Sequence, residues 1–95
     1  MEVITFVKGT VPPSKIEEFE SGYENLKRIM KPKGLIASYL LQGANEEGIY
    51  IIENVWASQK ALDKMRSEER PAGIELFMKF GVKPSLRVYN VVNSF

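Results

Sequence analysis

The segment covering residues 35–56 reads LIASYLLQGANEEGIYIIENVW and decides the fold. Leu35–Gln42 and Ile49–Trp56 predict two strands, because apolar, Ile- and Tyr-rich runs of this length are typical of strands. The GANEEG loop between them, residues 43–48, is polar and predicts an antiparallel hairpin. Strand alternation in the second segment places Tyr50, Ile52, Asn54 and Trp56 on one face.

The segment before this hairpin predicts a strand and a helix. Residues 3–7 alternate as a strand, and the following turn-rich stretch, with Pro12 and Pro13, should stop further ladder bonding. Ser14 and Glu17 have the spacing of a capping box, so we expect Ser14 to open the helix. Apolar residues then recur at steps of three and four: Ile16, Phe19, Tyr23, Leu26, Ile29 and Met30. The helix should stop at the sequence Lys31-Pro32-Lys33-Gly34.

The segment after the hairpin predicts two further helices and a last strand. Ser58 is a good N-cap for a helix that places Leu62 and Met65 inward, and residues 67–70 form a charged break. Pro71 fits the first turn of a short helix with Ile74, Phe77 and Met78 on its apolar side. Residues 86–92 predict the last strand.

The order β-α-β-β-α-(α)-β predicts an α+β, ferredoxin-like fold with a four-stranded antiparallel sheet and helices over one face. With 95 residues and no internal repeat or linker, residues 1–95 should form a single domain. Strands two, three and four are apolar on both faces, whereas a sheet with one wet face should alternate. We therefore expect a homodimer through sheet-to-sheet packing, which makes a dimeric α+β barrel.

Composition excludes several classes of function. A net charge of +1 argues against a nucleic-acid partner, which would need clustered excess Lys and Arg. The absence of Cys and His removes disulfides, imidazole metal sites and Ser–His catalysis, so we expect no metal site. No apolar run approaches the ~20 residues of a membrane span, and no secretory signal is visible, so a cytoplasmic location is the default expectation.

Several short motifs together resemble one family. Trp56 ends a strand and is followed at once by Ala57-Ser58-Gln59-Lys60-Ala61-Leu62. With Lys15-Ile16-Glu17-Glu18-Phe19 in the first helix and Gly34-Leu35 before the second strand, the chain is similar to the antibiotic-biosynthesis-monooxygenase (ABM) superfamily over nearly its whole length. These are dimeric α+β-barrel proteins, and they include cofactor-independent oxygenases of polyketide aromatics or quinols, haem-degrading enzymes and proteins without known activity.

The resemblance implies a pocket between the sheet and the helices, in which Trp56 is the best match to the family pattern. Asn54 lies two positions earlier on the same strand face, where many relatives carry an acid. The histidine that haem-degrading relatives use is absent, which disfavours a haem-cleaving role.

The candidate catalytic residues are Asn54, Trp56 and Tyr50. The amide of Asn54 can bind a carbonyl or phenolate oxygen while Trp56 stacks on an aromatic ring. The alternative is a core tryptophan beside an asparagine that bonds backbone at a strand end.

The candidate substrate-binding residues are Arg87, Tyr39, Tyr89 and Phe77. Tyr39, Tyr50 and Tyr89 lie on three predicted strands and could converge to orient a quinol. Arg87 could hold an anionic oxygen at a pocket mouth. Each of these residues also has an ordinary structural role, in strand packing for the aromatics and at a solvated strand end or a dimer contact for Arg87.

The leading hypothesis is an ABM-like homodimer that binds a small aromatic or quinone-like molecule and acts as a cofactor-independent monooxygenase. The alternatives are a non-catalytic ligand-binding or regulatory dimer and a purely structural dimer. Oxygen uptake separates the first two, and the presence of a cavity separates both from the third.

Overall fold

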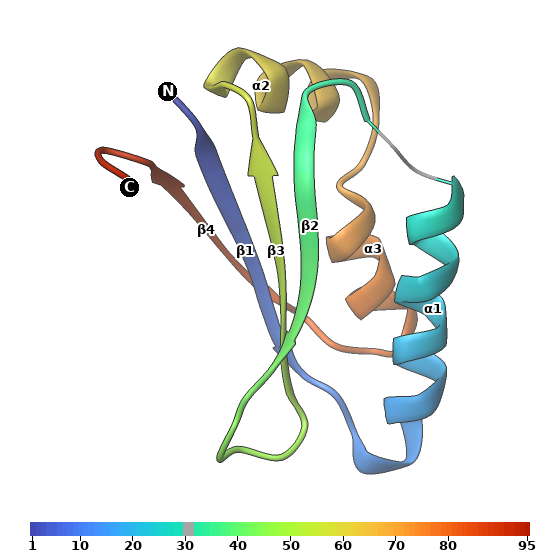
Figure 1. Ribbon diagram of the computed structural model, residues 1–95. Helices are drawn as coiled ribbons and strands as arrows, with labels where there is room; N and C mark the ends of the chain where they lie inside the picture. The colour runs from blue at the N-terminus through green and yellow to red at the C-terminus, as the bar shows by residue number, and fades with distance from the viewer. Residues whose placement is uncertain (30–31) are drawn as a thin grey trace.

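The computed structural model describes residues 1–29 and 32–95, and its strands and helices follow the predicted order (Figure 1). The elements are β1 (Val3–Thr10), a 3₁₀ turn η1 (Pro13–Lys15), α1 (Ile16–Ile29), β2 (Leu35–Gln42), β3 (Ile49–Trp56), α2 (Gln59–Glu68), α3 (Ala72–Lys79) and β4 (Ser85–Asn90). The predicted positions of Met30 and Lys31 lie outside the described residues. Within the described ranges, no helix has the length and apolar character to cross a membrane.

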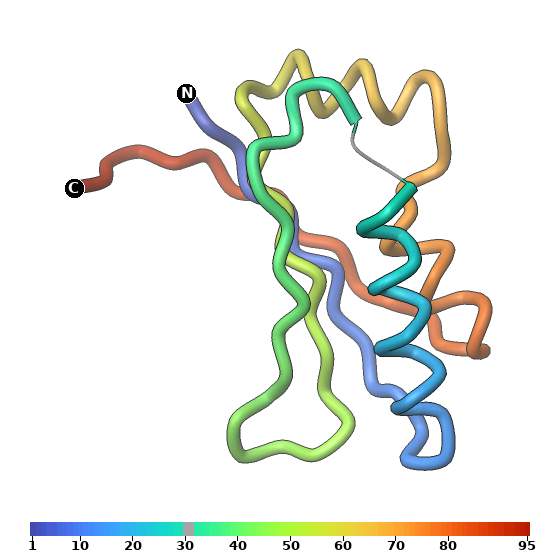
Figure 2. The backbone as a smooth tube through the Cα atoms, turned by 45° about the vertical axis from the view of Figure 1, so that its right-hand side comes forward, coloured from blue at the N-terminus to red at the C-terminus, as the bar shows by residue number. Residues whose placement is uncertain are grey.

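The four strands form one antiparallel sheet in the order β2-β3-β1-β4. All three helices lie on the same side of this sheet, as the two views in Figures 1 and 2 show. The predicted ferredoxin-like α+β fold is therefore confirmed. We call the side under the helices the helix face and the other side the open face.

The end of β1 and the start of α1 both differ from the prediction. β1 continues to Thr10 rather than ending at Val7, because residues 8–10 still pair with β3. Ser14 lies within η1, where no side-chain cap bond forms, so the predicted capping box is wrong. The prolines start this turn instead, because their fixed φ suits a helical first turn, and the amide of Lys15 donates to the carbonyl of Pro12 at 2.8 Å.

Two later boundaries also shift. α2 extends to Glu68, into the predicted charged break. β4 spans residues 85–90 rather than 86–92, although the amide of Val91 still donates to the carbonyl of Glu2 at 2.9 Å. The predicted cap of α2 is confirmed, because the Ser58 Oγ accepts a bond from the amide of Ala61 at 3.1 Å.

Two groups of buried side chains fill the space between the helices and the sheet. The larger group includes Phe19, Tyr50 and Phe77, and the Phe19 ring centroid lies 5.3 Å from that of Tyr50 and 4.7 Å from that of Phe77. The smaller group, which involves α2, consists of Val3, Trp56 and Leu62. This division leaves room for a cavity where the two groups meet.

Gly34 lies just before β2 and packs against α2. Its φ of +91° lies in the left-handed region, which favours glycine. A Cβ at this position would lie 2.5 Å from the Cβ of Ala61 on α2, and its carbonyl accepts a bond from the amide of Ala57 at 2.8 Å. Both the backbone conformation and the close approach therefore require glycine.

We predict that Gly34→Ala lowers the free energy of unfolding by at least about 1–2 kcal/mol, because an L side chain at positive φ adds strain to the clash. Urea unfolding followed by circular dichroism measures this change. Gly81→Ala is the matched control, since Gly81 also has positive φ (+75°) but nothing lies within 4 Å of a Cβ there. An equal loss in both variants would show that the contact with Ala61 contributes nothing.

Candidate functional site

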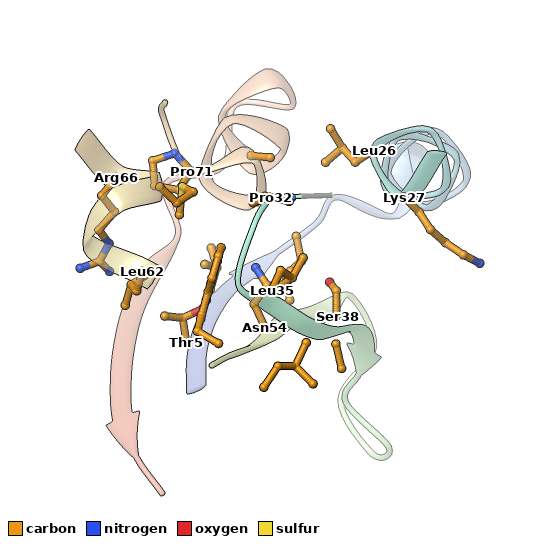
Figure 3. A pocket seen from close by; sticks show the side chains of 18 of the residues that line it. Thr5, Leu26, Lys27, Pro32, Leu35, Ser38, Asn54, Leu62, Arg66 and Pro71 are labelled. Carbon is orange, nitrogen blue, oxygen red and sulfur yellow. The ribbon is translucent and has the colours of Figure 1, made fainter. Parts of the chain in front are cut away.

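A cavity of about 440 Å³ lies between the helix face of the sheet and the helices (Figure 3). Its apolar walls come from all four strands and all three helices, and include Val7, Leu26, Leu35, Ile52, Leu62, Ala72 and Leu86. A β-bulge between Leu35 and Ala37 interrupts β2 beside it. Bulges are common next to binding sites, where they re-aim a side chain, and the bulged Ile36 lines this cavity.

Asn54 and Trp56 both line this cavity from β3. They share the helix face because strand residues two apart point the same way. Trp56 is only 2% exposed, and the nitrogen of the Asn54 amide points away from the sheet in Figure 3. The Asn54 Oδ1 is buried and has no hydrogen-bond partner. An unpaired buried acceptor costs about 1–3 kcal/mol, so this amide is not explained as a satisfied core group.

Thr5 holds the indole of Trp56 in position. The Trp56 Nε1 donates to the Thr5 Oγ1 at 3.3 Å, and Thr5 is 4% exposed. The two residues come from neighbouring strands, since Thr5 pairs with Asn54 in the β1–β3 register. Because its N–H is occupied, Trp56 contributes apolar ring atoms to the lining of the cavity rather than a donor. Sequence reasoning missed Thr5, although strand alternation from Val3 and Val7 places it on the helix face.

Tyr23 and Ser38 form a second polar group at the open edge of the cavity, where Ser38 is exposed and Tyr23 is half-buried. The Tyr23 Oη and Ser38 Oγ lie 2.7 Å apart and join α1 to β2. Ser38 is directly opposite Asn54 in the β2–β3 register. The sequence prediction assigned Tyr23 only to the apolar stripe of the helix and did not single out Ser38. The available signal was that Ser38 interrupts an otherwise apolar stretch of its strand.

Tyr50, a predicted catalytic residue, does not line the cavity. It is 1% exposed, packs on Phe19 and donates its hydroxyl hydrogen to the Glu20 carboxylate. Burial, with the adjacent carboxylate, raises the pKa of Tyr50 to about 12. A phenol that keeps its proton to this pH cannot act as a base near neutrality. Phe77 is also buried in the larger core group rather than at the cavity wall.

Tyr39, Tyr89 and Arg87 lie on the open face, away from this cavity. Tyr39 pairs with Glu53, and Tyr89 and Arg87 pair with Ile4 and Phe6 respectively, all of which point away from the helices. The prediction that the three strand tyrosines converge is therefore wrong. Adjacent residues of a strand point to opposite faces of the sheet. The sequence alone did not establish the strand register, which puts Tyr39 and Tyr89 on the open face and Tyr50 on the helix face.

The charged residues at the cavity are both basic. The side chains of Lys27 and Arg66 contribute to its rim, and Figure 3 shows the Lys27 amine pointing away from it. Among the described lining residues no carboxylate is present. Within the same part of the chain, no group of three or more acidic side chains could hold a metal ion. The cavity thus offers an apolar slot with an amide and a hydroxyl pair on one wall.

The family model for antibiotic biosynthesis monooxygenases matches residues 3–70. The chain belongs to this family. The ABM assignment also confirms the resemblance that was inferred from Trp56 and its flanking residues. A comparison with curated proteins found no significant match.

Solved structures share this fold at low sequence identity. A conserved protein from Methanosarcina mazei Go1 is 20% identical with a TM-score of 0.74, over 94% of this chain and 91% of its own. A variant of SnoaB, a cofactor-independent oxygenase from Streptomyces nogalater, is 17% identical with a TM-score of 0.75, over 98% and 95% of the two chains. A haem-degrading protein from Mycobacterium tuberculosis is 20% identical with a TM-score of 0.73, over 100% and 99%. At these identities, the likeness of the ABM chain to each of them is one of fold.

We predict that the protein loses stability between pH 10 and pH 12 because of Tyr50. In this window the unfolded phenol ionises at its ordinary pKa of about 10, whereas the folded one, with its pKa raised to about 12, keeps its proton. Unfolding then releases a proton, so the free energy of unfolding falls by about 2–3 kcal/mol as the pH rises. Urea unfolding across this range measures the slope. Tyr50→Phe should have a shallower slope, and an identical slope would contradict the assignment.

Proposed function

We propose that this ABM protein binds a small, flat aromatic or quinone-like molecule in the cavity beside Asn54 and Trp56. The observation that carries the proposal is the Asn54 amide, which lines a mainly apolar cavity and makes no side-chain hydrogen bond within the described residues, either through its buried Oδ1 or through its NH2 group. A volume of about 440 Å³ lies within the range of about 300–1,000 Å³ that is typical of ligand pockets. The Trp56 ring provides a stacking surface, and the amide provides a donor for a carbonyl or phenolate oxygen.

We propose cofactor-independent monooxygenation as the reaction, which family membership supports. An ionised phenol would add O₂ at a ring carbon to give a hydroperoxide, which then loses water to leave a quinone carbonyl. One oxygen atom stays in the product and the other leaves as water, so a phenol and O₂ give a quinone and H₂O. The cavity would exclude water, and the Asn54 amide would stabilise the developing negative oxygen.

The side chains on the cavity wall limit how weakly acidic the substrate can be. Among the described residues no carboxylate lines the cavity, and the chain has no His, so the wall offers neither a carboxylate nor an imidazole as a general base. The substrate would therefore have to be acidic enough to lose its proton readily, as polyhydroxylated aromatics are. The same observation favours the second candidate function, a binding protein without turnover.

We also propose that the active form is a homodimer packed through the open face. No helix in the described part of the chain covers this face, and it carries large apolar side chains, among them Tyr39, Leu41 and Tyr89. Tyr89 packs against Phe6 with ring centroids 5.5 Å apart. Several exposed large apolar side chains on one uncovered face are typical of an interface.

Two side chains of opposite charge on the open face, Glu53 and Arg87, would form ion pairs with a second copy of the chain. Glu53 and Arg87 both pair with Phe6 across the sheet, one on each side of it. They are thus two strands apart, about 9–10 Å, and no ion pair involving either is found within the described residues. A two-fold axis along β1 would lay β3 over β4 of the second copy, so each Glu53 would face an Arg87.

The binding proposal is tested with the fluorescence of Trp56, which is the single tryptophan of the chain. Titration with 1,4-naphthoquinone should quench it saturably. Asn54→Leu should weaken binding three- to tenfold through the lost hydrogen bond, while stability stays equal or rises because the unpaired acceptor is gone. Asn45→Leu, in the exposed hairpin loop, is the matched control and should bind as the unaltered protein does.

Turnover is tested separately with an oxygen electrode and 1,8-dihydroxynaphthalene, whose product would be the corresponding hydroxynaphthoquinone and water. Oxygen uptake faster than the uncatalysed rate would support the monooxygenase if Asn54→Leu lowers it. Flat uptake with intact quenching would favour the binding protein. The absence of quenching would overturn the proposal as a whole.

The dimer is tested by exchanging charges. Glu53→Arg and Arg87→Glu should each raise the dimer dissociation constant at least about a hundredfold, because like charges then meet across the interface. The double variant should restore the dimer, as measured by sedimentation equilibrium. Glu46→Arg, in the exposed loop, is the control. A monomeric unaltered protein, or a double variant that stays monomeric, would contradict this arrangement.

A further inference from the structure

We propose that the Tyr23–Ser38 hydroxyl pair is a second hydrogen-bonding subsite of the cavity, and that it selects ligands with two oxygens on neighbouring ring carbons. This inference rests on the proposed binding function and goes further, because it specifies the arrangement of oxygen atoms that the ligand must carry. Neither residue was singled out by sequence reasoning. Both line the cavity, from α1 and β2 respectively.

The hydroxyl pair has hydrogen-bonding capacity left over. Each hydroxyl has one O–H to donate and lone pairs to accept. One of the two O–H groups is used in the 2.7 Å bond between Tyr23 Oη and Ser38 Oγ, whichever residue donates it. The other O–H is left to donate, and no second side-chain partner of either hydroxyl is present within the described residues. The pair therefore offers one donor to a ligand.

The second donor is the Asn54 amide, next to the pair. Ser38 is the direct cross-strand partner of Asn54, and both side chains line the cavity from the helix face. Residues directly opposite in an antiparallel pair have Cβ atoms about 4.5–5.5 Å apart. The two donors therefore lie on one wall, side by side, and Figure 3 shows Ser38 and Asn54 neighbouring each other there.

The rest of the cavity explains why these donors decide the selection. The Trp56 N–H is already bonded to Thr5, and the other strand residues that surround the two donors on the wall are apolar. A flat ring stacked on Trp56 with a single oxygen can satisfy one donor only. A ring with oxygens on neighbouring carbons can accept from the Asn54 amide and from the hydroxyl pair at once. A single neutral hydrogen bond of this kind changes affinity about three- to tenfold.

Two isomers provide the test. 1,2-Naphthoquinone carries its oxygens on neighbouring carbons, and 1,4-naphthoquinone carries the same atoms on opposite sides of the ring. Both are neutral, and the chain has no Cys for them to alkylate. Titration of the unaltered protein, with Trp56 quenching and calorimetry as readouts, should show three- to tenfold tighter binding of the 1,2-isomer.

The variants separate the subsite from the cavity itself. The double variant Tyr23→Phe, Ser38→Ala should bring the ratio of the two affinities close to one, because either single variant keeps one free O–H donor. It should leave the affinity for the 1,4-isomer within about twofold. Ser21→Ala is the matched control, since this exposed serine lies on α1 outside the cavity and should keep the full preference. Thermal unfolding of each variant confirms that it is folded.

The outcomes distinguish this inference from the proposed function. Equal affinity for the two isomers in the unaltered protein, or an unchanged preference in the Tyr23→Phe, Ser38→Ala double variant, would overturn the subsite while the binding function stands. No binding of either isomer by the unaltered protein would overturn both. A preference that disappears in the double variant and remains in Ser21→Ala supports the subsite.

Discussion

The ladder between β1 and β3 aligns Val3 with Trp56 and Thr5 with Asn54, and this register decides which side chains the helices cover. A slip by one residue would turn every side chain of a strand to the other face. With the observed register, Trp56 is buried under α2 and can reach Thr5 with its indole nitrogen. The cavity, the stacking surface and the amide beside it all depend on that alignment.

The side chains between the helices and the sheet do not fill all the space beside Asn54 and Trp56, and a cavity remains there. The aromatic group of Phe19, Tyr50 and Phe77 is packed tightly and leaves no polar group unpaired, since Tyr50 has Glu20 as its acceptor. Beside it, Asn54 keeps a buried oxygen without a partner. A protein interior normally satisfies such atoms, and departures from that rule concentrate at functional sites. The contrast between these two neighbouring regions is the physical basis for assigning function to one and stability to the other.

The two faces of the sheet differ in the side chains that they carry. The helix face carries the candidate site, and the open face carries an apolar surface with Glu53 and Arg87 on either side of Phe6. A domain of 95 residues gains only modest stability from its own core, so coverage of a second apolar face would add substantially to it. Residues that sequence reasoning placed together as substrate ligands, Tyr39, Tyr89 and Arg87, belong to this second face.

The sequence by itself determined the order of the elements, the ferredoxin-like fold, the family and the shared face of Asn54 and Trp56. Those features depend on local periodicity, on capping and turn residues and on strand alternation, all of which act over a few neighbouring positions. Only the tertiary structure decided that Tyr50 is a core residue bonded to Glu20, that Tyr39 and Tyr89 face away, and that Tyr23 and Ser38 meet beside Asn54. These relations join residues 15 or more positions apart in the chain, through strand register and helix placement, which no local pattern encodes.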